Sequence, residues 1–355
     1  MTDPFARSAQ LQEAFAQVSK AVEKVIAGLD DFERERALFA LVSAWSLAEE
    51  MWIYKGDPSR PAFTEWMANG RKTAGDSPYT VYKTAPVSPR YIYRLYGNMG
   101  KATYFGAQLY MLVHGFNAPS GVISQDQIVT DADGNFEIIL SSERPADAVN
   151  WLQLAPTDYV IMTREYYYDP SVETPMWTAI ERLDAVTAEP IPFATRMDTA
   201  IAYFESIVLS TIEIAGMLSV NQFSPPDAEV RVPKYGGSLF PTRDTYYDGF
   251  FVKLEPGQAI RMQGWMPEHW AYVSFVFYDR WYATLDYPQV HCYLTGRDLE
   301  LNPDGTYTIY LSAEDPGHPN WIQMGALREG LYSYRYMLAD SNPKPTIEVV
   351  TIGEA

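Results

Sequence analysis

The chain has 355 residues, a formal net charge of −18 and an isoelectric point near 4.6. Such a charge repels phosphate backbones and anionic lipids, so we expect neither nucleic acid nor membrane as a partner. Aromatic residues make up 14%, with 26 Tyr and 9 Trp, which suits β-sandwich faces and clefts that hold organic ligands. The length exceeds the usual size of a single core and predicts more than one domain.

The single cysteine, Cys292, excludes an intramolecular disulfide framework. The first residues lack the apolar segment of a signal peptide, and no run approaches the ~20 apolar residues of a membrane helix. We therefore expect a soluble, cytoplasmic protein in which Cys292 is a buried and inert thiol.

Residues 8–55 have the apolar spacing of helices. Gly28 ends a first helix, and a second runs from about Phe32 to Tyr54 before Pro58 stops it. The expected buried stripe of this second helix consists of Leu38, Leu41, Val42, Trp45 and Leu47.

A stretch from Asp133 to Asp169 occurs a second time from Asp304 to Asp340. Each copy begins with Asp-Gly, a hairpin-turn dipeptide, and continues with the two-residue apolar period of a half-buried strand. An Asn-Trp pair follows, and then a strand with Arg164 or Arg335. We expect each Trp to close one end of a sandwich core and each Asn to hydrogen-bond the loop backbone.

The duplication extends beyond this stretch, because a shift of 168 residues also aligns Asp76 with Asp244, Tyr79 with Tyr247 and Tyr104 with Tyr272. A hydrophobic helix at 195–222 precedes the second copy, and a proline-containing connection at 170–195 predicts a semi-rigid link.

The predicted fold is therefore α+β, mainly β with helices. It contains internally duplicated antiparallel β-sandwich or jelly-roll-like domains, each preceded by a helix, and an N-terminal helical segment. The expected domains are N-terminal helices at 1–60, a first β-sandwich unit at 61–185, and a second helix-plus-sandwich unit at 186–355 that duplicates about 30–185.

Three features resemble a known group: Arg-Asp-Thr-Tyr-Tyr-Asp-Gly-Phe-Phe-Val-Lys-Leu at 243–254, the Asp-Gly hairpins, and the Asn-Trp-(Leu/Ile)…Arg-x-Tyr pattern. They are similar to bacterial families of paired domains of unknown function, in which an Asn-x-Asp-Thr-Leu-Tyr motif precedes one β-sandwich and an Asn-Trp-Leu…Arg-x-Tyr motif closes another. The resemblance implies jelly-roll-like sandwiches, similar to carbohydrate-active and lectin-like folds, and no agreed activity.

No signature of metal, nucleophilic or nucleotide chemistry is found. The sequence contains no zinc-binding pair among its four histidines, no Gly-x-Ser-x-Gly elbow and no phosphate-binding loop; the histidines are His114, His269, His291 and His318. We expect neither a metal nor a cofactor.

The candidate site is the polar cluster after the apolar strand at 272–278, because the first copy has Met111 and Leu112 where the second has Asp279 and Arg280. Shared residues serve the shared fold, so divergence between duplicates indicates a site. The predicted catalytic residues are Asp279, Arg280, His291 and Tyr247, and the predicted substrate-binding residues are Asp244, Tyr246, Trp281 and Tyr282.

Three functions remain open. The first is a cofactor-independent hydrolase or lyase that acts on a sugar-like or small cyclic organic substrate by carboxylate, Tyr and His acid-base chemistry. The second is a non-catalytic carbohydrate- or apolar-metabolite-binding protein, and the third is a structural or assembly protein. The expected partner is a small-molecule or carbohydrate ligand, and a homo-oligomer is left open. A deep pocket with a perturbed carboxylate or His favours the enzyme, a shallow aromatic groove the binder, and a flat, apolar exposed patch the assembly protein.

Overall fold

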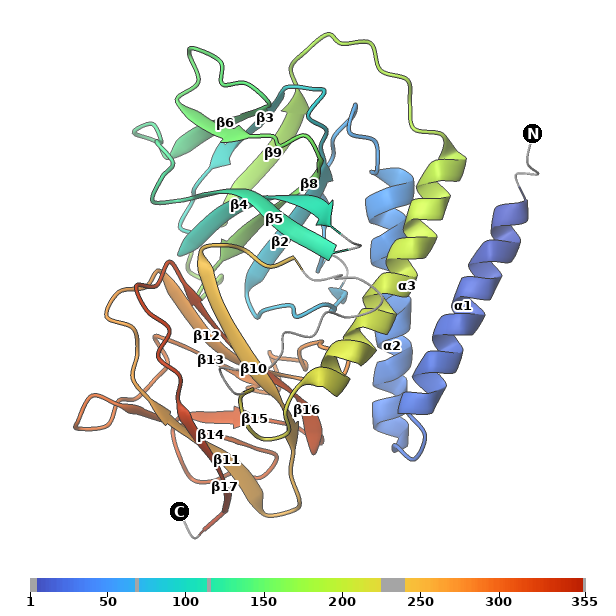
Figure 1. Ribbon diagram of the computed structural model, residues 1–355. Coiled ribbons are helices and arrows are strands. Elements are labelled where there is room, and N and C mark those ends of the chain that lie inside the picture. Colours follow the sequence, from blue (N-terminus) through green and yellow to red (C-terminus); the bar gives the residue numbers. More distant parts are fainter. Residues whose placement is uncertain (1–4, 68–69, 114–115, 225–239, 354–355) are drawn as a thin grey trace. The chain divides into compact units, whose positions relative to one another are not determined.

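The computed structural model describes residues 5–67, 70–113, 116–224 and 240–353 (Figure 1), so the predicted residue His114 lies outside the described part. The N-terminal region is helical, as expected. Its elements are α1 (Ala6–Val25), α2 (Asp31–Ala48) and the π-helix η1 (Glu49–Tyr54), and a further helix, α3 (Phe193–Met217), follows the first β region.

Helix α2 begins at the Asp30 carboxylate, which accepts a hydrogen bond from the Glu33 N–H at 2.9 Å. Leu41 and Leu47 are buried as expected, but Leu38 and Val42 are 62% and 56% exposed, so that part of the predicted stripe is wrong. The buried side is instead formed largely by small residues, which allow neighbouring backbones to approach closely; these are Ala37, Ala40, Ser43, Ala44 and Ala48.

The first sandwich consists of a five-stranded sheet and a four-stranded sheet. In sheet order, the five strands are β1 (Thr64–Glu65), β2 (Thr80–Pro86), β8 (Asp158–Tyr166), β4 (Tyr104–Val113) and β5 (Phe116–Ser124). The four are β7 (Asn150–Gln153), β6 (Asn135–Ser141), β3 (Tyr93–Asn98) and β9 (Trp177–Arg182).

The second sandwich repeats this order, which confirms the duplicated fold. One sheet is β10 (Thr245–Lys253), β16 (Glu329–Met337), β12 (Tyr272–Tyr278) and β13 (Tyr293–Thr295). The other is β15 (Trp321–Gln323), β14 (Tyr307–Ser312), β11 (Gln258–Gly264) and β17 (Thr346–Thr351). The chain crosses between the two sheets of a sandwich several times, and the consecutive pairs β4–β5, β6–β7, β12–β13 and β14–β15 stay within one sheet. The pairs β6–β7 and β14–β15 are parallel, so the sandwiches are not wholly antiparallel.

The strand registers correct the alignment of the two copies at their first strands. Arg164 on β8 pairs with Tyr82 of β2, and Arg335 on β16 pairs with Tyr247 of β10. Tyr82, not Tyr79, is therefore the counterpart of Tyr247, and the alignment of Asp76 with Asp244 is wrong for the same reason. A uniform shift fails here because the connections between strands differ in length, while the strands themselves are repeated.

The Asn-Trp pairs lie where β7 and β15 begin. Asn150 is buried and bonds the Val129 N–H and carbonyl, at 2.8 and 2.9 Å, and Asn320 bonds Glu300 in the same way at 2.9 and 2.8 Å. The expected loop-holding role of Asn is confirmed. Each Trp is only half-buried, because strand alternation turns the Asn and the residue after Trp inward, so the expected core role of Trp is wrong.

Two compact units are present, and their boundaries differ from the expected ones at residues 60 and 185. The first unit includes the N-terminal helices and α3 up to Ser210. Each unit also contains a short segment that precedes the first sandwich strand of the other copy: residues 240–243 belong to the first unit, and residues 72–78 to the second.

Equivalent arginines bind these two segments. In the first unit, the Arg164 guanidinium donates to the Tyr110 hydroxyl at 2.6 Å and to the Phe240 carbonyl. In the second, Arg335 donates to the Tyr278 hydroxyl at 2.7 Å and to the Gly75 carbonyl. Both arginines are buried, and the repeated Arg of each copy therefore fixes a backbone segment.

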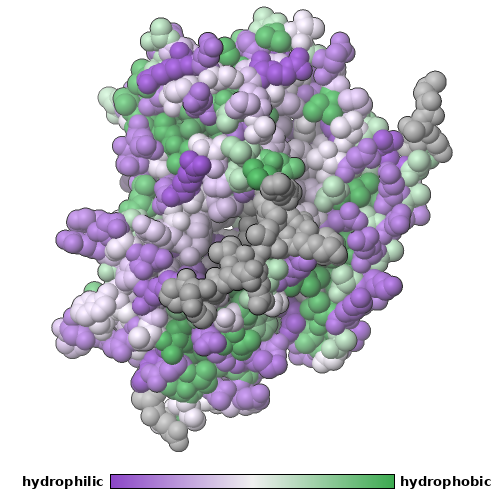
Figure 2. Space-filling view, in the orientation of Figure 1, coloured by the Kyte–Doolittle hydropathy of each residue, from purple (hydrophilic) through white to green (hydrophobic). Residues whose placement is uncertain are grey.

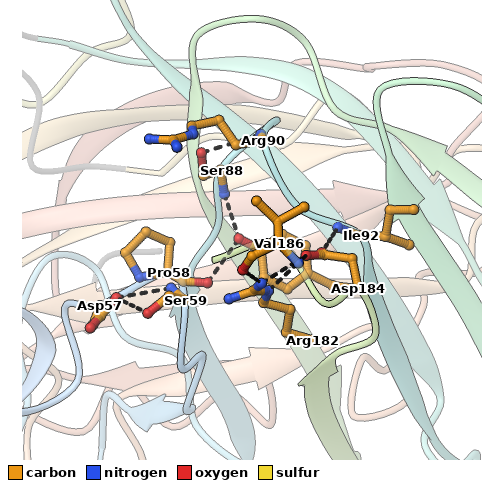
Figure 3. Close-up of polar contacts among 10 residues, drawn as sticks. Asp57, Pro58, Ser59, Ser88, Arg90, Ile92, Arg182, Asp184 and Val186 are labelled. Atoms are coloured by element: carbon orange, nitrogen blue, oxygen red, sulfur yellow. Dashed lines mark hydrogen bonds and ion pairs between the residues drawn. The ribbon is translucent and has the colours of Figure 1, made fainter. Parts of the chain in front are cut away.

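The connection expected at 170–195 is also part of the sandwich, because it supplies the edge strand β9. Figure 3 shows how the chain continues: the Asp184 carboxylate accepts hydrogen bonds from Arg182 at 2.8 Å and from the backbone N–H of Ile92 at 2.7 Å. Burial would raise the pKa of Asp184, but these donors and the Val186 N–H hold it below its ordinary value. The link is anchored by a charged network as well as restricted by proline.

Helix α3 is, among the described residues, the helix that is long and apolar enough to cross a membrane, and 44% of its most apolar window is buried.

Candidate functional site

The first sandwich has a groove on the outer face of its four-stranded sheet. Along β3, Tyr93 and Leu95 face the core, and the two-residue period turns Arg94 and Tyr96 to the outside. Glu137 of β6 pairs with Tyr96 and shares this outer face. The groove has a volume of about 540 Å³, which is within the range of pockets that hold small organic ligands.

Aromatic rings form the floor of this groove. Trp177, at the start of β9, is 52% exposed, and its ring meets that of Tyr96 edge to face at a centroid distance of 6.0 Å. The Arg94 guanidinium lies 4.4 Å from the Tyr96 centroid and pairs with Glu137 at 3.2 Å. Tyr96 is thus held from two sides, while the Trp177 ring retains open surface on which a ligand ring can stack.

Two loops border the floor. The loop with Val129 and Asp131 is fixed by Asn150 at one end and by a tight turn at the other, where Gly134 has a φ of +82°. The Asp131 carboxylate accepts hydrogen bonds from Asn135 and from the Asp133 N–H, and these hold its pKa below the ordinary value. The second loop contributes Asp147 and the exposed Val149.

The same face of the second sandwich has different side chains. Arg261 corresponds to Arg94, because each pairs in register with a glutamate of the neighbouring edge strand. Four further groove positions differ: Gln263 corresponds to Tyr96, Thr308 to Glu137, Asn302 to Asp131 and Lys344 to Trp177. The aromatic groove is therefore a feature of the first copy.

The predicted residues after β12 form a tight, largely buried turn. Asp279 is 3% exposed, and its carboxylate accepts hydrogen bonds from the N–H groups of Trp281 and Ala283 at 2.9 and 3.0 Å. Arg280 pairs with Glu329 at 2.6 Å. Trp281 is buried too, so this end of the strand offers a ligand little polar or aromatic surface.

The partly buried Tyr282 holds segment 72–78 rather than standing open to a cleft. Its ring packs edge to face on Tyr278, with centroids 4.7 Å apart, and its carbonyl accepts from the Gly75 N–H at 2.8 Å. A Cβ on Gly75, whose φ is +77°, would lie 2.8 Å from that ring. Glycine is required here for close approach as well as for backbone conformation.

The remaining predicted residues divide between the two ends of the sheet. His291 is exposed and precedes Cys292, whose carbonyl accepts from Phe277 near the end of β12. Tyr247 and Ser274 both pair with Arg335, so Tyr247 lies level with Ser274 in the sheet. Ser274 is four residues before the end of β12, which at about 3.3 Å per residue puts Tyr247 ~13 Å from that end along the strand direction. Asp244 and Tyr246 lie at the same end as Tyr247. The expectation that all eight residues share one end of the sandwich is therefore wrong.

A buried carboxyl that the prediction omitted, Asp76, lies beside this turn. It accepts hydrogen bonds from the Thr284 N–H at 2.9 Å and from the Thr284 hydroxyl. Burial raises its pKa, and the neighbouring Asp279 acts in the same direction, while the Thr284 hydrogen bonds and the charge of Lys72 oppose it. Burial also raises the pKa of the Cys292 thiol to about 12, which agrees with an inert thiol.

Among the described residues, no group of three or more His, Cys, Asp or Glu side chains is arranged to hold a metal ion. The groove residues Arg94, Tyr96, Asp131 and Trp177 were missed by the sequence prediction. Their signal was present, because the two copies differ at three of these positions and alternation along the strands places Arg94, Tyr96 and Trp177 on one side.

The fold defines a duplicated β-sandwich protein with a groove on its first copy. A profile of the family described as "Protein of unknown function (DUF1214)" matches residues 68–171 and 242–337, more than half of the chain. The chain belongs to this family, and the two matches coincide with the two copies.

The comparison with solved structures finds one that resembles nearly the whole chain. An uncharacterised protein from Burkholderia cenocepacia is 22% identical, with a TM-score of 0.88, and the match covers 99% of this chain and 98% of that one. A protein from Vibrio parahaemolyticus is 14% identical with a TM-score of 0.49, covering 88% and 97%. No curated protein sequence matches. The first similarity shows the fold alone.

Proposed function

We propose that the protein is a non-catalytic binding protein for a small carbohydrate-like ring, which stacks in the groove of the first sandwich. The observation that carries this proposal is the open face of Trp177 at the floor of a groove of about 540 Å³. A sugar ring presents an apolar face to such an indole and directs its hydroxyl groups to the side.

The surrounding side chains suit the hydroxyl groups of a sugar. Glu137, Asp131 and Asp147 provide carboxylate acceptors, and Asn135 provides an amide, all bordering one groove. Charge-assisted hydrogen bonds from hydroxyl groups to carboxylates are strong, so a few of them can fix the orientation of a stacked ring.

The test compares two equally exposed tryptophans. Full-length protein is titrated with N-acetylated chitotriose, a neutral trisaccharide, by isothermal calorimetry. Trp177→Ala is expected to weaken binding at least tenfold, about 1.4 kcal/mol, without a large change in Tm. Trp265→Ala is the matched control, because Trp265 is 56% exposed and lies outside the groove. Equal affinities for wild type and Trp177→Ala would contradict the proposal.

The hydrolase or lyase hypothesis remains a prediction that turnover assays must test. It draws least support from the cluster after β12, since Asp279 and Trp281 are buried in a turn. We also propose that Asp244, Thr245 and Tyr246 correspond to the Asp-Thr-Leu part of the Asn-x-Asp-Thr-Leu-Tyr motif. That correspondence assigns the motif to the start of β10 and gives it no catalytic role.

Assembly is a second candidate function, because helix α2 exposes several large apolar side chains. Leu38, Phe39 and Val42 are 62%, 44% and 56% exposed, at spacings that place them on one side of the helix. Figure 2 shows hydrophobic residues interspersed with hydrophilic ones over the helices at the right. Light scattering after size-exclusion chromatography tests this: Leu38→Glu should shift an oligomer toward monomer, and a wild-type monomer would contradict assembly.

A further inference from the structure

The charges around the groove indicate which kind of ring it accepts. Three carboxylates line the groove, those of Asp131, Glu137 and Asp147, and Arg94 is the cation that lines it with them. Arg94 is already paired with Glu137 at 3.2 Å and with Glu181. Its charge is therefore largely compensated, and the carboxylates of Asp131 and Asp147 face the groove with no cation of their own among its lining residues.

Nearby cations do not restore the balance. Arg144 is on the same loop as Asp147, but its guanidinium donates to the carbonyls of Ala148 and Val149 and lies over the ring of Trp151. Asp131 keeps its negative charge in mildly acidic solution, because its hydrogen bonds to Asn135 and to the Asp133 N–H favour the ionised form.

We infer that the ligand of this groove is a cyclic organic cation, a ring with a protonated amine, of which an amino sugar is the carbohydrate form. This inference rests on the proposed function and specifies its ligand. The ring stacks on Trp177, where an ammonium group near the indole gains a cation–π contribution. The ammonium group then meets carboxylates, while the carboxylates disfavour an anionic ring such as a uronic acid.

The second copy provides an internal comparison, because it keeps the ion pair and lacks the carboxylates of Asp131 and Glu137, while Glu300 stands where the first copy has Val129. Arg261 pairs with Glu348, as Arg94 pairs with Glu181. Asn302 and Thr308 occupy the positions of Asp131 and Glu137, and Lys344 occupies that of Trp177. The carboxylates of Asp131 and Glu137 and the ring of Trp177 are thus not required by the fold, since the second copy lacks them.

The experiment uses two ligands that differ in charge. Chitotriose, with protonated amines, and its neutral N-acetylated form are titrated into the full-length chain at low salt and about pH 6, where exposed carboxylates are ionised. We expect the cationic trisaccharide to bind at least tenfold more tightly, and this preference to shrink as salt is added.

The double variant Asp131→Asn with Glu137→Thr carries the residues of the second copy and should reduce the ratio of the two affinities to near one. Asn302 already forms the equivalent turn, with the Gly305 N–H donating to its carbonyl at 2.9 Å, so the fold should tolerate the change. Asp147→Asn, in an exposed loop, is a second variant and should lower the ratio by itself. Equal affinities of wild type for both trisaccharides would overturn the cationic ligand but leave the proposed function intact. Binding of neither would overturn both.

Discussion

The two copies of the sandwich share a buried arginine that fixes a backbone segment, and they differ on the outer face of one sheet. In both, a buried Arg bonds a Tyr hydroxyl and a backbone carbonyl, through Arg164 in the first copy and Arg335 in the second. On the outer face of the sheet that contains β3 in the first copy and β11 in the second, Trp177 and Tyr96 correspond to Lys344 and Gln263. The repeated residues therefore stabilise the fold that both copies share. A function specific to one copy would instead depend on the surface residues that differ.

The largest expected effect on stability comes from replacing the buried arginine of each copy. Arg164→Met and Arg335→Met should each lower the free energy of unfolding by roughly 2–4 kcal/mol, because a buried carbonyl and a Tyr hydroxyl both lose a charged donor. Urea denaturation followed by circular dichroism measures the loss. Losses that differ severalfold between the two variants would show that the arginines are not equivalent.

The next effect concerns the buried asparagines that hold a loop in each copy. Asn150→Ala and Asn320→Ala each remove three hydrogen bonds to backbone groups, and we expect losses of about 2–3 kcal/mol. Asn150 also positions Val129 in the groove wall, so Asn150→Ala should weaken ligand binding as well, and Asn320→Ala should not. Calorimetric titration of both variants separates the effect on loop stability from the effect on ligand binding. Equal losses of ligand affinity in Asn150→Ala and Asn320→Ala would contradict a role in the groove for Asn150 alone.

Most of the fold could be predicted from the sequence, because strand alternation, Asp-Gly turns and a repeated stretch are local patterns. The packing of segments 72–78 and 240–243 with the opposite copies could not, since no local pattern specifies which Arg a distant carbonyl meets. The site was misplaced for a related reason. Asp279 and Arg280 differ between copies, but tertiary packing determines what their side chains contact. Asp279 accepts hydrogen bonds from the N–H groups of Trp281 and Ala283, and Arg280 donates one to Glu329.

A smaller effect tests this corrected view of Asp279. If Asp279 were a catalytic residue, as its place in the sequence predicts, Asp279→Ala would abolish activity and leave Tm nearly unchanged. The structure predicts a loss of stability of about 1–2 kcal/mol, because the carboxylate accepts two backbone N–H groups in a buried turn. His291→Ala is the surface control and should change stability little, since the His291 side chain is exposed. Thermal denaturation of the two variants decides, and similar Tm values would contradict a structural role for Asp279.

The smallest effect is a difference in the pH dependence of stability between two carboxyls, one in each copy. Burial raises the pKa of Asp76, while Asn135 and backbone N–H groups lower that of Asp131. Between its ordinary pKa and its raised one, the folded protein binds a proton at Asp76 that the unfolded chain has already released. The contribution of Asp76 to stability therefore falls as pH rises through this window, and the contribution of Asp131 is lost as pH falls.

Asparagine variants should reveal these opposite signs. As pH rises from about 4 to about 7, the Tm of Asp76→Asn should increase relative to wild type, because the variant no longer buries an ionisable carboxyl. The Tm of Asp131→Asn should decrease relative to wild type as pH rises towards about 4, below the ordinary Asp pKa, because ionised Asp131 accepts more favourable hydrogen bonds than the amide. Asp76 follows Gly75, whose carbonyl Arg335 binds, and Pro241 follows Phe240, whose carbonyl Arg164 binds. Pro241 is therefore the counterpart of Asp76 in the first unit, and it has no titrating side chain that would mask the effect of Asp76 on the Tm. Parallel Tm curves for wild type and Asp76→Asn would show that burial does not shift the pKa of the Asp76 carboxyl. Segments 72–78 and 240–243 would then differ in sequence but not in how pH affects their stability.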